Sequence, residues 1–266
     1  MMEWWWAYLA LGAFAGFFGG LLGIGGGSAL VPVLAFIFAA KGFAPGHVVH
    51  LALGTGIATM IFTSASSVRS HHQRRAVNWR IALKMMPGVA VGAFGGALAA
   101  GGLDPRLLAV AFTILIYGLA TQMMLDTRLA ASGALPGSGA LSAAGGIIGL
   151  LSSLSATGGA SLTVPFLLKR RISVHEAIGT AAAVGWPLAL AGTLGYVLSG
   201  IGEPGLPGWS AGYVYVPALV WIAAASMAMA PVGARVAYRT PAKTLKRAFA
   251  VVLYLLATGM LVSTLS

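Results

Sequence analysis

Long apolar stretches separated by short polar segments run along the whole chain. A helix needs about 20 predominantly apolar residues to cross the hydrocarbon core of a bilayer, and most of these stretches have that length. They cover residues 4–40, 46–68, 81–101, 106–124, 138–168, 174–199, 211–234 and 245–264. The strands of a membrane barrel would instead alternate apolar and polar positions over about ten residues. The pattern therefore predicts an all-α polytopic membrane protein.

The first and fifth stretches are too long for one crossing, and small residues interrupt each of them. The interruptions are GIGGGS at residues 23–28 and SATGGAS at residues 155–161. Because glycine is the poorest helix former after proline, we expect the helix to break at both places. Each long stretch then enters and leaves the bilayer on the same side, either as a hairpin or as a pair of short helices.

The two halves of the chain are similar in sequence. GGGSALVPVL at 25–34 matches GGASLTVPFL at 158–167, and HLALGT at 50–55 matches HEAIGT at 175–180. Further on, Trp79 and Pro87 match Trp209 and Pro217, and Tyr117 matches Tyr254. Four matches in chain order indicate a duplication. We predict two repeats, residues 1–130 and 131–266, each made of a broken segment and three membrane helices.

Composition agrees with a membrane location. Hydrophobic residues make up 58% of the 266 and charged residues only 8%, against about 25% charged in soluble domains. The net charge is +11, and in a membrane protein such an excess reflects cytoplasmic loops rich in Lys and Arg rather than nucleic acid binding. The expected partners are therefore the lipid bilayer and a small anion, with no nucleic acid; the glycine rows also permit a homodimer.

The positions of the basic residues predict the orientation. Fourteen of the 16 lie in or beside four segments: Arg69, Arg74, Arg75, Arg80, Lys84, Arg128, Lys169, Arg170, Arg171, Arg235, Arg239, Lys243, Lys246 and Arg247. By the positive-inside rule these segments are cytoplasmic, whereas the loop at 200–210 carries only Glu203 and lies outside. Corresponding loops of the two halves thus fall on opposite sides. We therefore predict an inverted-topology repeat in the inner (cytoplasmic) membrane, with both termini outside.

The glycine breaks are the strongest candidate for a functional site. A helix that restarts after a break has backbone N–H groups without internal partners, and its dipole favours an anion. In inverted repeats two such breaks meet near the midplane of the membrane. The predicted substrate-binding residues are Gly25, Gly26, Gly27, Ser28, Thr55, Gly158, Gly159, Ser161 and Thr180. The alternative is that these glycines serve only close helix packing, the interpretation favoured for Gly88, Gly92 and Gly96.

Three titratable residues are candidates for proton coupling. His50 and His175 occupy equivalent positions in the two halves, and Glu176 is the carboxylate nearest to a helix core. An intramembrane histidine can titrate near neutral pH, whereas Glu176 is also explained by a place in the cytoplasm beside Arg170 and Arg171. The hydroxyls of the helix at 46–68 either line a polar path or bond back to the helix carbonyls.

Other chemistry has little support in the sequence. The chain has no Cys, which excludes disulfides and thiolate sites, and it shows no metal-ligand spacing and no paired carboxylates. GIGGGS lacks the preceding strand that a nucleotide-binding loop requires. We therefore expect no cofactor, no metal and no enzymatic activity, with a membrane-embedded hydrolase using Ser28 or Ser161 as the less favoured alternative.

Several of these segments together resemble the TauE/SafE sulfite exporter family of membrane permeases. They are GLLGIGGGSALVPVL at 20–34, HLALGTGIATMIFTSASS at 50–67, VNW at 77–79, and a weaker second copy with Pro165 and AIGT at 177–180. The second break departs from the first in having Ala160 where the first has Gly27. The resemblance implies a secondary transporter that exports a sulfur-containing anion such as sulfite or a sulfonate by alternating access, with proton coupling as an option. A passive anion channel is the alternative from another functional class.

Overall fold

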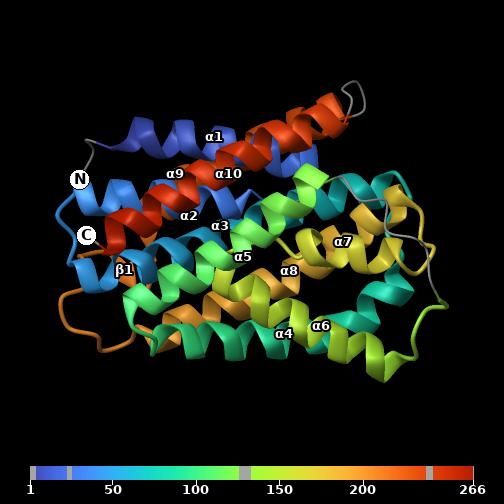
Figure 1. The fold of residues 1–266 in the computed structure, drawn as a ribbon, viewed down its shortest axis with the longest axis horizontal. Helices are drawn as coiled ribbons and strands as arrows, with labels where there is room; N and C mark the ends of the chain where they lie inside the picture. The colour runs from blue at the N-terminus through green and yellow to red at the C-terminus, as the bar shows by residue number, and fades with distance from the viewer. Residues whose placement is uncertain (1–3, 23–25, 126–132, 238–241, 266) are drawn as a thin grey trace.

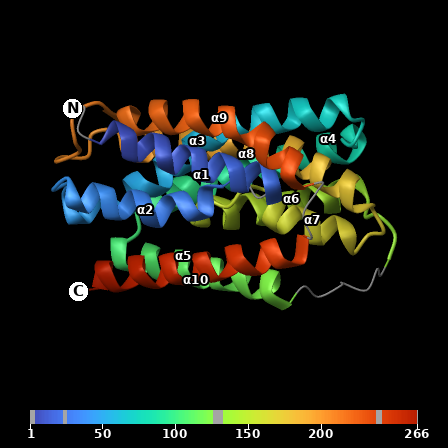
Figure 2. The ribbon, with the colours of Figure 1, turned by 90° about the horizontal axis from the view of Figure 1, so that it is seen from above.

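A computed structural model describes residues 4–22, 26–125, 133–237 and 242–265 as a bundle of roughly parallel and antiparallel helices (Figures 1 and 2). Its elements are α1 (Trp5–Leu22), α2 (Gly27–Ala40), α3 (Pro45–Gln73), α4 (Trp79–Gly101), α5 (Pro105–Leu125), α6 (Ser138–Ser155), α7 (Ala160–Leu168), α8 (Val174–Ser199), β1 (Ser210–Ala211), β2 (Val214–Tyr215), α9 (Val216–Ala237) and α10 (Ala242–Leu265). Among the described helices, seven are long and apolar enough to cross a membrane. The predicted all-α polytopic fold is confirmed.

Both long apolar stretches are divided into two helices. In the first, α1 and α2 flank residues 23–25, which lie outside the described part of the chain. In the second, α6 ends at Ser155 and α7 begins at Ala160. At about 1.5 Å per residue, the nine residues of α7 extend only about 14 Å, so α7 begins deep inside the bundle. One helix therefore ends before each predicted break, and another begins after it.

The two ends of the bundle differ in structure. At one end, which we call the hairpin end, α3 begins, α4 and α8 end, and the short β1–β2 hairpin closes the surface. There the His50 ring contacts the carbonyl of Ala100, and the Tyr213 N–H donates to Tyr196. At the opposite end, α3 ends and α4 and α8 begin, joined by the Asn78–Glu176 hydrogen bond. Figures 1 and 2 show that α1 begins and α10 ends at the hairpin end.

This arrangement separates the charges along the bundle axis. The basic segments predicted to be cytoplasmic all belong to the end where α3 ends and α8 begins, which we call the basic end; Arg128 and Arg239 fall outside the described residues. The hairpin end has Lys41 and Arg106 together with Asp104 and Glu203. Two boundaries differ from prediction by five residues. Helix α3 continues to Gln73, beyond residue 68, and residues 211–215 belong to the hairpin and not to the membrane helix that follows.

Helices of the two halves pack in matching pairs. Helix α1 packs along α9, and α4 packs along α6. Glycines make both contacts close: a Cβ added to Gly16 or Gly92 would collide with the backbone of Ser226 or Gly146 on the facing helix. The close-packing interpretation of the glycine row on α4 is therefore confirmed. Small residues that allow backbones to approach are a usual feature of membrane helix interfaces.

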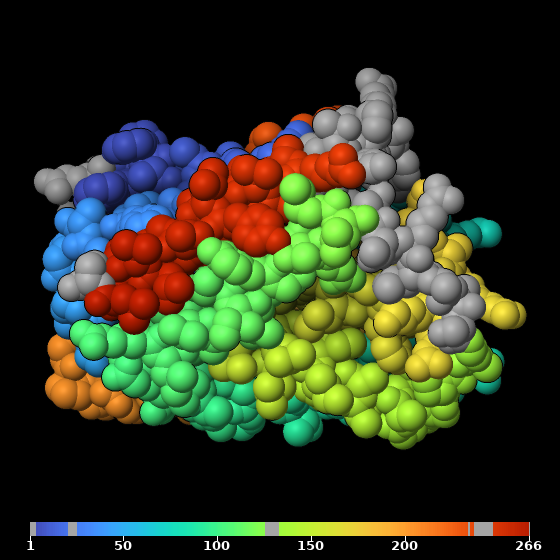
Figure 3. All heavy atoms as spheres, in the orientation of Figure 1, coloured from blue at the N-terminus to red at the C-terminus, as the bar shows by residue number. Residues whose placement is uncertain are grey.

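Helices α5 and α10 are joined by two equivalent hydrogen bonds and lie side by side across one face of the molecule (Figure 3). The Tyr117 hydroxyl bonds to that of Thr258, and the Tyr254 hydroxyl bonds to that of Thr121. The two tyrosine rings are in edge contact at 5.0 Å. Each tyrosine thus pairs with a threonine of the other half of the chain.

Candidate functional site

The two broken segments meet inside the bundle. A Cβ added to Gly27, the first residue of α2, would overlap the carbonyl oxygen of Ala156 in the second break and would lie 3.0 Å from the sulfur of Met60. Gly26 and Ala156 both adopt left-handed backbone conformations, with φ of 69° and 44°. This conformation costs little for glycine but is strained for alanine. The backbone is therefore sharply turned on both sides of the contact.

Ser28 and Ser161 occupy equivalent places at the starts of α2 and α7. Each is the second residue of its helix, and side chains near a helix start lean back toward the N-terminus. Their exposed fractions are 0% and 6%, and neither hydroxyl has a hydrogen-bond partner among the described residues. A buried hydroxyl without a partner is costly, so both side chains have bonding capacity left for a ligand.

Backbone groups at these helix starts also have capacity for a ligand. Neither α2 nor α7 has a side-chain cap, since Gly26 and Gly159 hold the capping positions. The Ser161 N–H donates to the carbonyl of Gly158, so this predicted anion donor is already used within the chain. Within the described residues, no acceptor bonds to the N–H groups of Gly159 and Ala160. Gly25, another predicted donor, lies outside the described residues.

A cavity adjoins the second break. Its lining consists almost entirely of small and hydroxyl-bearing residues: Gly16, Gly19, Gly20, Thr63, Ser64, Ser67, Gly158, Gly159, Ala160, Ala181, Ala182, Gly185 and Ala230. The lining residues of α3 and α9 come from the half of each helix nearer the basic end, and those of α8 come from its first half, which begins there. The cavity therefore lies on the basic side of the breaks.

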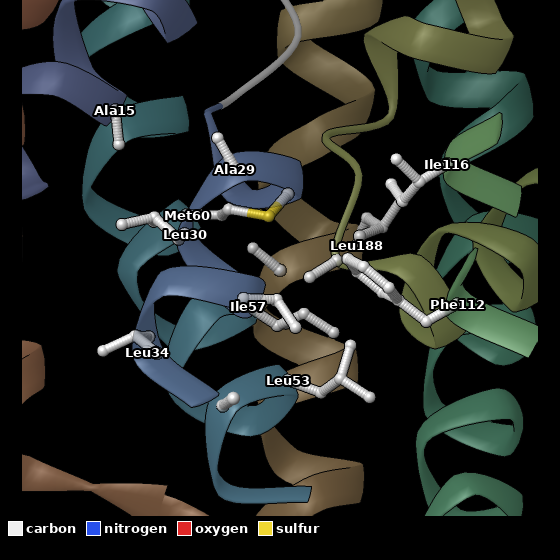
Figure 4. Packing of buried hydrophobic residues seen from close by; sticks show 14 of the residues in the cluster. Ala15, Ala29, Leu30, Leu34, Leu53, Ile57, Met60, Phe112, Ile116 and Leu188 are labelled. Atoms are coloured by element: carbon white, nitrogen blue, oxygen red, sulfur yellow. The ribbon is translucent and has the colours of Figure 1, made fainter. Parts of the chain in front are cut away.

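The opposite side of the breaks is filled with large apolar side chains. Leu34 of α2, Leu53 and Ile57 of α3, and Leu188 of α8 are fully buried there (Figure 4). Closer to the hairpin end, aromatic rings pack against Tyr215, with Phe38 and Phe43 centred 5.5 and 5.2 Å from it. The path from the breaks to the hairpin end is therefore closed by side-chain packing in this conformation.

Thr55 and Thr180 make matching hydrogen bonds at opposite ends of the bundle. The Thr55 hydroxyl accepts from the N–H of Tyr215, just before α9, at 2.9 Å. The Thr180 hydroxyl accepts from the N–H of Asn78, just before α4, at 3.0 Å. Both threonines are fully buried. Each one therefore anchors the start of a helix from the other half, and neither lines the cavity.

The titratable candidates also lie away from the breaks. His50 is near the hairpin end, where Nε2 lies 3.1 Å from the carbonyl oxygens of Ala100 and Leu103 and the ring stacks on Tyr213. His175 is exposed at the start of α8, at the basic end, and Glu176 beside it accepts a 2.6 Å hydrogen bond from the Asn78 amide. The structure thus places the two equivalent histidines at opposite ends and brings neither to the cavity.

The hydroxyl-rich face of α3 fits both of the interpretations offered for it. The Thr59 hydroxyl donates to the carbonyl of Gly56, and the Thr63 hydroxyl donates to that of Thr59. Thr63, Ser64 and Ser67 nevertheless line the cavity. Sequence reasoning missed Gly185 of α8, whose Cα lies 3.5 Å from a Cβ placed on Gly159. No pattern in the sequence distinguished Gly185 from the other small residues of this helix.

Known proteins with similar sequences are named as probable membrane transporters. A family model described as sulfite exporter TauE/SafE matches residues 8–260. A "Probable membrane transporter protein" of Haemophilus influenzae is 35% identical over 95% of this chain and 96% of its own length. Similarly named proteins of Bacillus subtilis and Methanocaldococcus jannaschii are 27% and 28% identical, over 86% and 79% of this chain and 89% and 77% of theirs. No solved structure matches the chain at a significant level. These matches, together with the apolar helices, show that this chain belongs to the TauE/SafE sulfite exporter family of membrane transporters.

Proposed function

We propose that this protein is a secondary transporter that moves a small sulfur-containing oxyanion across the cytoplasmic membrane by alternating access. The anion binds where α2 and α7 begin. One observation carries the proposal: the start of α2 packs against Ala156 in the second break, and each of the two helix starts has a buried hydroxyl, Ser28 or Ser161, that has no partner among the described residues. Helix starts in broken membrane segments bind anionic groups in transporters of this general architecture.

An inverted repeat is part of this proposal. Helices α3 and α8 run in opposite directions through the bundle, and the contact of α1 with α9 has its counterpart in that of α6 with α4. The hydrogen bonds of Thr55 and Thr180, made at opposite ends, support the same relation between the halves. Such a repeat can exchange conformations between its halves, which is the physical basis of alternating access.

We assign this conformation to a state that is closed toward the outside. The positive-inside rule places the basic end in the cytoplasm and both termini outside. The cavity then lies on the cytoplasmic side of the breaks, and packed apolar side chains close the outer side. Packing that closes the outer side of the breaks favours a transporter over a passive channel. An anion that enters from the cytoplasm and leaves after the helices rearrange is exported.

The serine hydrolase alternative has weaker support. It requires a histidine beside Ser28 or Ser161, whereas His50 bonds to carbonyls at the hairpin end and His175 lies exposed at the basic end. Proton coupling through His50, His175 or Glu176 stays a prediction. Because these residues lie outside the cavity, their protonation would have to affect the rearrangement of the helices and not the bound anion.

Flux measurements in proteoliposomes test the proposed site. A hydrogen bond to a charged group contributes about 1.5–3 kcal/mol, so Ser28→Ala and Ser161→Ala should each raise KM for sulfite or methanesulfonate by about tenfold or more. Ser226→Ala is the matched control, because that buried hydroxyl bonds to its own helix at Ala223. Wild-type kinetics in both Ser28→Ala and Ser161→Ala would contradict the site, and absence of flux for every sulfur oxyanion would contradict the function.

A further inference from the structure

The helices pack in two groups that do not coincide with the two halves of the sequence. Helix α9 packs along α1 and against α3, and α2 packs against α3; we call these four helices the first group. Helix α4 packs along both α6 and α8, and α7 packs on α8; these four are the second group. Figure 1 shows α1, α2 and α9 in the upper part of the bundle and α4, α6 and α8 in the lower part. Each group therefore contains one helix, α9 or α4, from the other half of the chain.

The two exchanged helices are firmly attached to their groups. The N–H of Tyr215, just before α9, donates to Thr55 of α3, and the N–H of Asn78, just before α4, donates to Thr180 of α8. Farther along, glycines bring the backbone of α1 against that of α9 and the backbone of α4 against that of α6. Backbone in such close contact cannot move aside as a flexible side chain would. These contacts favour movement of each group as one body.

The boundary between the groups passes through the candidate site. Gly27 of the first group contacts Ala156 in the break of the second group. The cavity has walls from α1, α3 and α9 on one side and from the second break, α7 and α8 on the other. At the hairpin end, His50 of α3 spans the boundary, with Nε2 3.1 Å from the carbonyl oxygens of Ala100 and Leu103. The site thus lies between the groups and not within either of them.

The contact of α3 with α8 across this boundary is made by side chains. A Cβ added to Gly185 of α8 would lie 3.4 Å from the Ser64 hydroxyl of α3, and one added to Gly192 would lie 3.2 Å from Cγ2 of Ile57. Neither glycine is opposed by the backbone of α3, in contrast to the glycines within the groups. The boundary is therefore easier to separate than the contacts inside each group.

The size of the cavity shows that its walls must separate during transport. Its volume is about 20 Å³, and a single water molecule already requires about 10–15 Å³ on this measure. An oxyanion such as sulfite is much larger than water and does not fit in this conformation. Entry of the anion therefore requires the helices on the two sides of the boundary to move apart.

We infer that the moving parts of this transporter are the two helix groups and not the two halves of the chain. The groups rotate against each other about the contact of Gly27 with Ala156, so that the boundary opens first toward one end of the bundle and then toward the other. Opening toward the hairpin end requires His50 to leave the carbonyls of Ala100 and Leu103. The inference rests on the proposed function and identifies the parts that move in it.

Two pairs of introduced cysteines that share one position test the inference. The chain has no cysteine of its own. The pair Ile57→Cys and Gly192→Cys joins α3 to α8 across the boundary, whereas Ala93→Cys and Gly192→Cys joins α4 to α8 within the second group. A Cβ on Gly192 would lie 3.2 Å from Cγ2 of Ile57 and 4.0 Å from the Cβ of Ala93. Disulfides need about 3.5–4.5 Å between the two Cβ atoms, so both pairs are within reach.

Methanesulfonate flux in proteoliposomes is compared before oxidation, after oxidation and after reduction. Linking residues 57 and 192 should abolish flux reversibly, whereas linking residues 93 and 192 should leave it at the level before oxidation. Both links join the first half of the chain to the second, so movement of the halves as units would make both of them abolish flux. That result, or flux that survives the link across the boundary, would overturn the inference. Absence of flux in the wild type for every sulfur oxyanion would instead remove the proposed function.

A distance measurement at the surface provides a second test that leaves the core unchanged. Spin labels on Arg80→Cys of α4 and Arg235→Cys of α9 report across the boundary, and labels on Arg80→Cys and Ser138→Cys of α6 report within the second group; all three positions are exposed. Double electron–electron resonance is recorded with and without sulfite. We expect sulfite to shift the distance between positions 80 and 235 and to leave that between 80 and 138 unchanged. A constant distance across the boundary, or equal shifts in both pairs, would overturn the inference.

Discussion

Gly27→Ala tests directly whether the two broken segments must touch. The added Cβ would lie less than 3.0 Å from the Ala156 carbonyl oxygen, a separation that real Cβ atoms essentially never show, and ordinary contact begins at 3.4 Å. The obstacle is backbone, which cannot swing aside as a flexible side chain would. Overpacking of this kind costs about 1–3 kcal/mol. The higher helix propensity of alanine offsets at most about 1 kcal/mol of that, so the net effect is destabilising.

The consequence for transport follows from the geometry. Pushing the two breaks apart moves the start of α2 away from that of α7. The hydrogen bonds that one of the two helix starts donates to the anion then become weaker. Loss of one charge-assisted hydrogen bond is worth about 1.5–3 kcal/mol, so flux at low substrate concentration should fall by about tenfold or more. Thermal unfolding in detergent and proteoliposome flux of methanesulfonate measure the two effects separately.

Gly95→Ala is the matched control for this substitution. Gly95 also lies within a helix, α4, but a Cβ there would meet nothing within 4 Å. Helix propensity alone then applies, and the variant should be unchanged or slightly more stable, with wild-type flux. If Gly27→Ala unfolds at the wild-type temperature and transports at the wild-type rate, the contact between the breaks has no functional role and the reasoning fails.

Three further predictions concern the frame around the site. Thr180→Val should destabilise the protein by about 1–3 kcal/mol in chemical unfolding, because the partly buried Asn78 N–H loses its acceptor; an unchanged midpoint would contradict this. Single cysteines replacing Arg75 and Glu203 should react with impermeant thiol reagents from opposite faces of the membrane, and labelling from one face would contradict the inverted orientation. Gly92→Ala should destabilise the contact of α4 with α6, since the Cβ collides with backbone; an unfolding temperature equal to that of the wild type would show that this contact can relax.

The sequence was sufficient for the fold because its main determinants are local. Continuous apolar runs predicted the helices, and glycine clusters predicted the breaks around Gly26 and Gly159, since helix propensity acts over a few residues. The glycine row on α4 predicted close packing correctly. The boundary at residue 211 was wrong because the β1–β2 pairing depends on contacts across the Tyr213 region, which hydropathy does not report.

The roles of individual polar residues were harder to predict. The matching positions of Thr55 and Thr180 were visible in the sequence, but their partners, Tyr215 and Asn78, lie 160 and 102 residues away. Similarity between repeats identifies equivalent residues without giving their depth in the membrane. In the inverted repeat that we propose, equivalent residues lie at opposite ends, as His50 and His175 do, so only residues close to the crossing of the two breaks can meet at one site.

Anomalous diffraction from crystals soaked with selenite, a heavier oxyanion of the same shape as sulfite, would locate the bound anion itself. Because the natural chain contains sulfur but no selenium, a selenium peak reports the bound anion alone. We expect one strong peak within hydrogen-bond distance of the hydroxyls of Ser28 and Ser161, between the starts of α2 and α7. A peak confined to the arginines of the basic end, with none between the two helix starts, would contradict it.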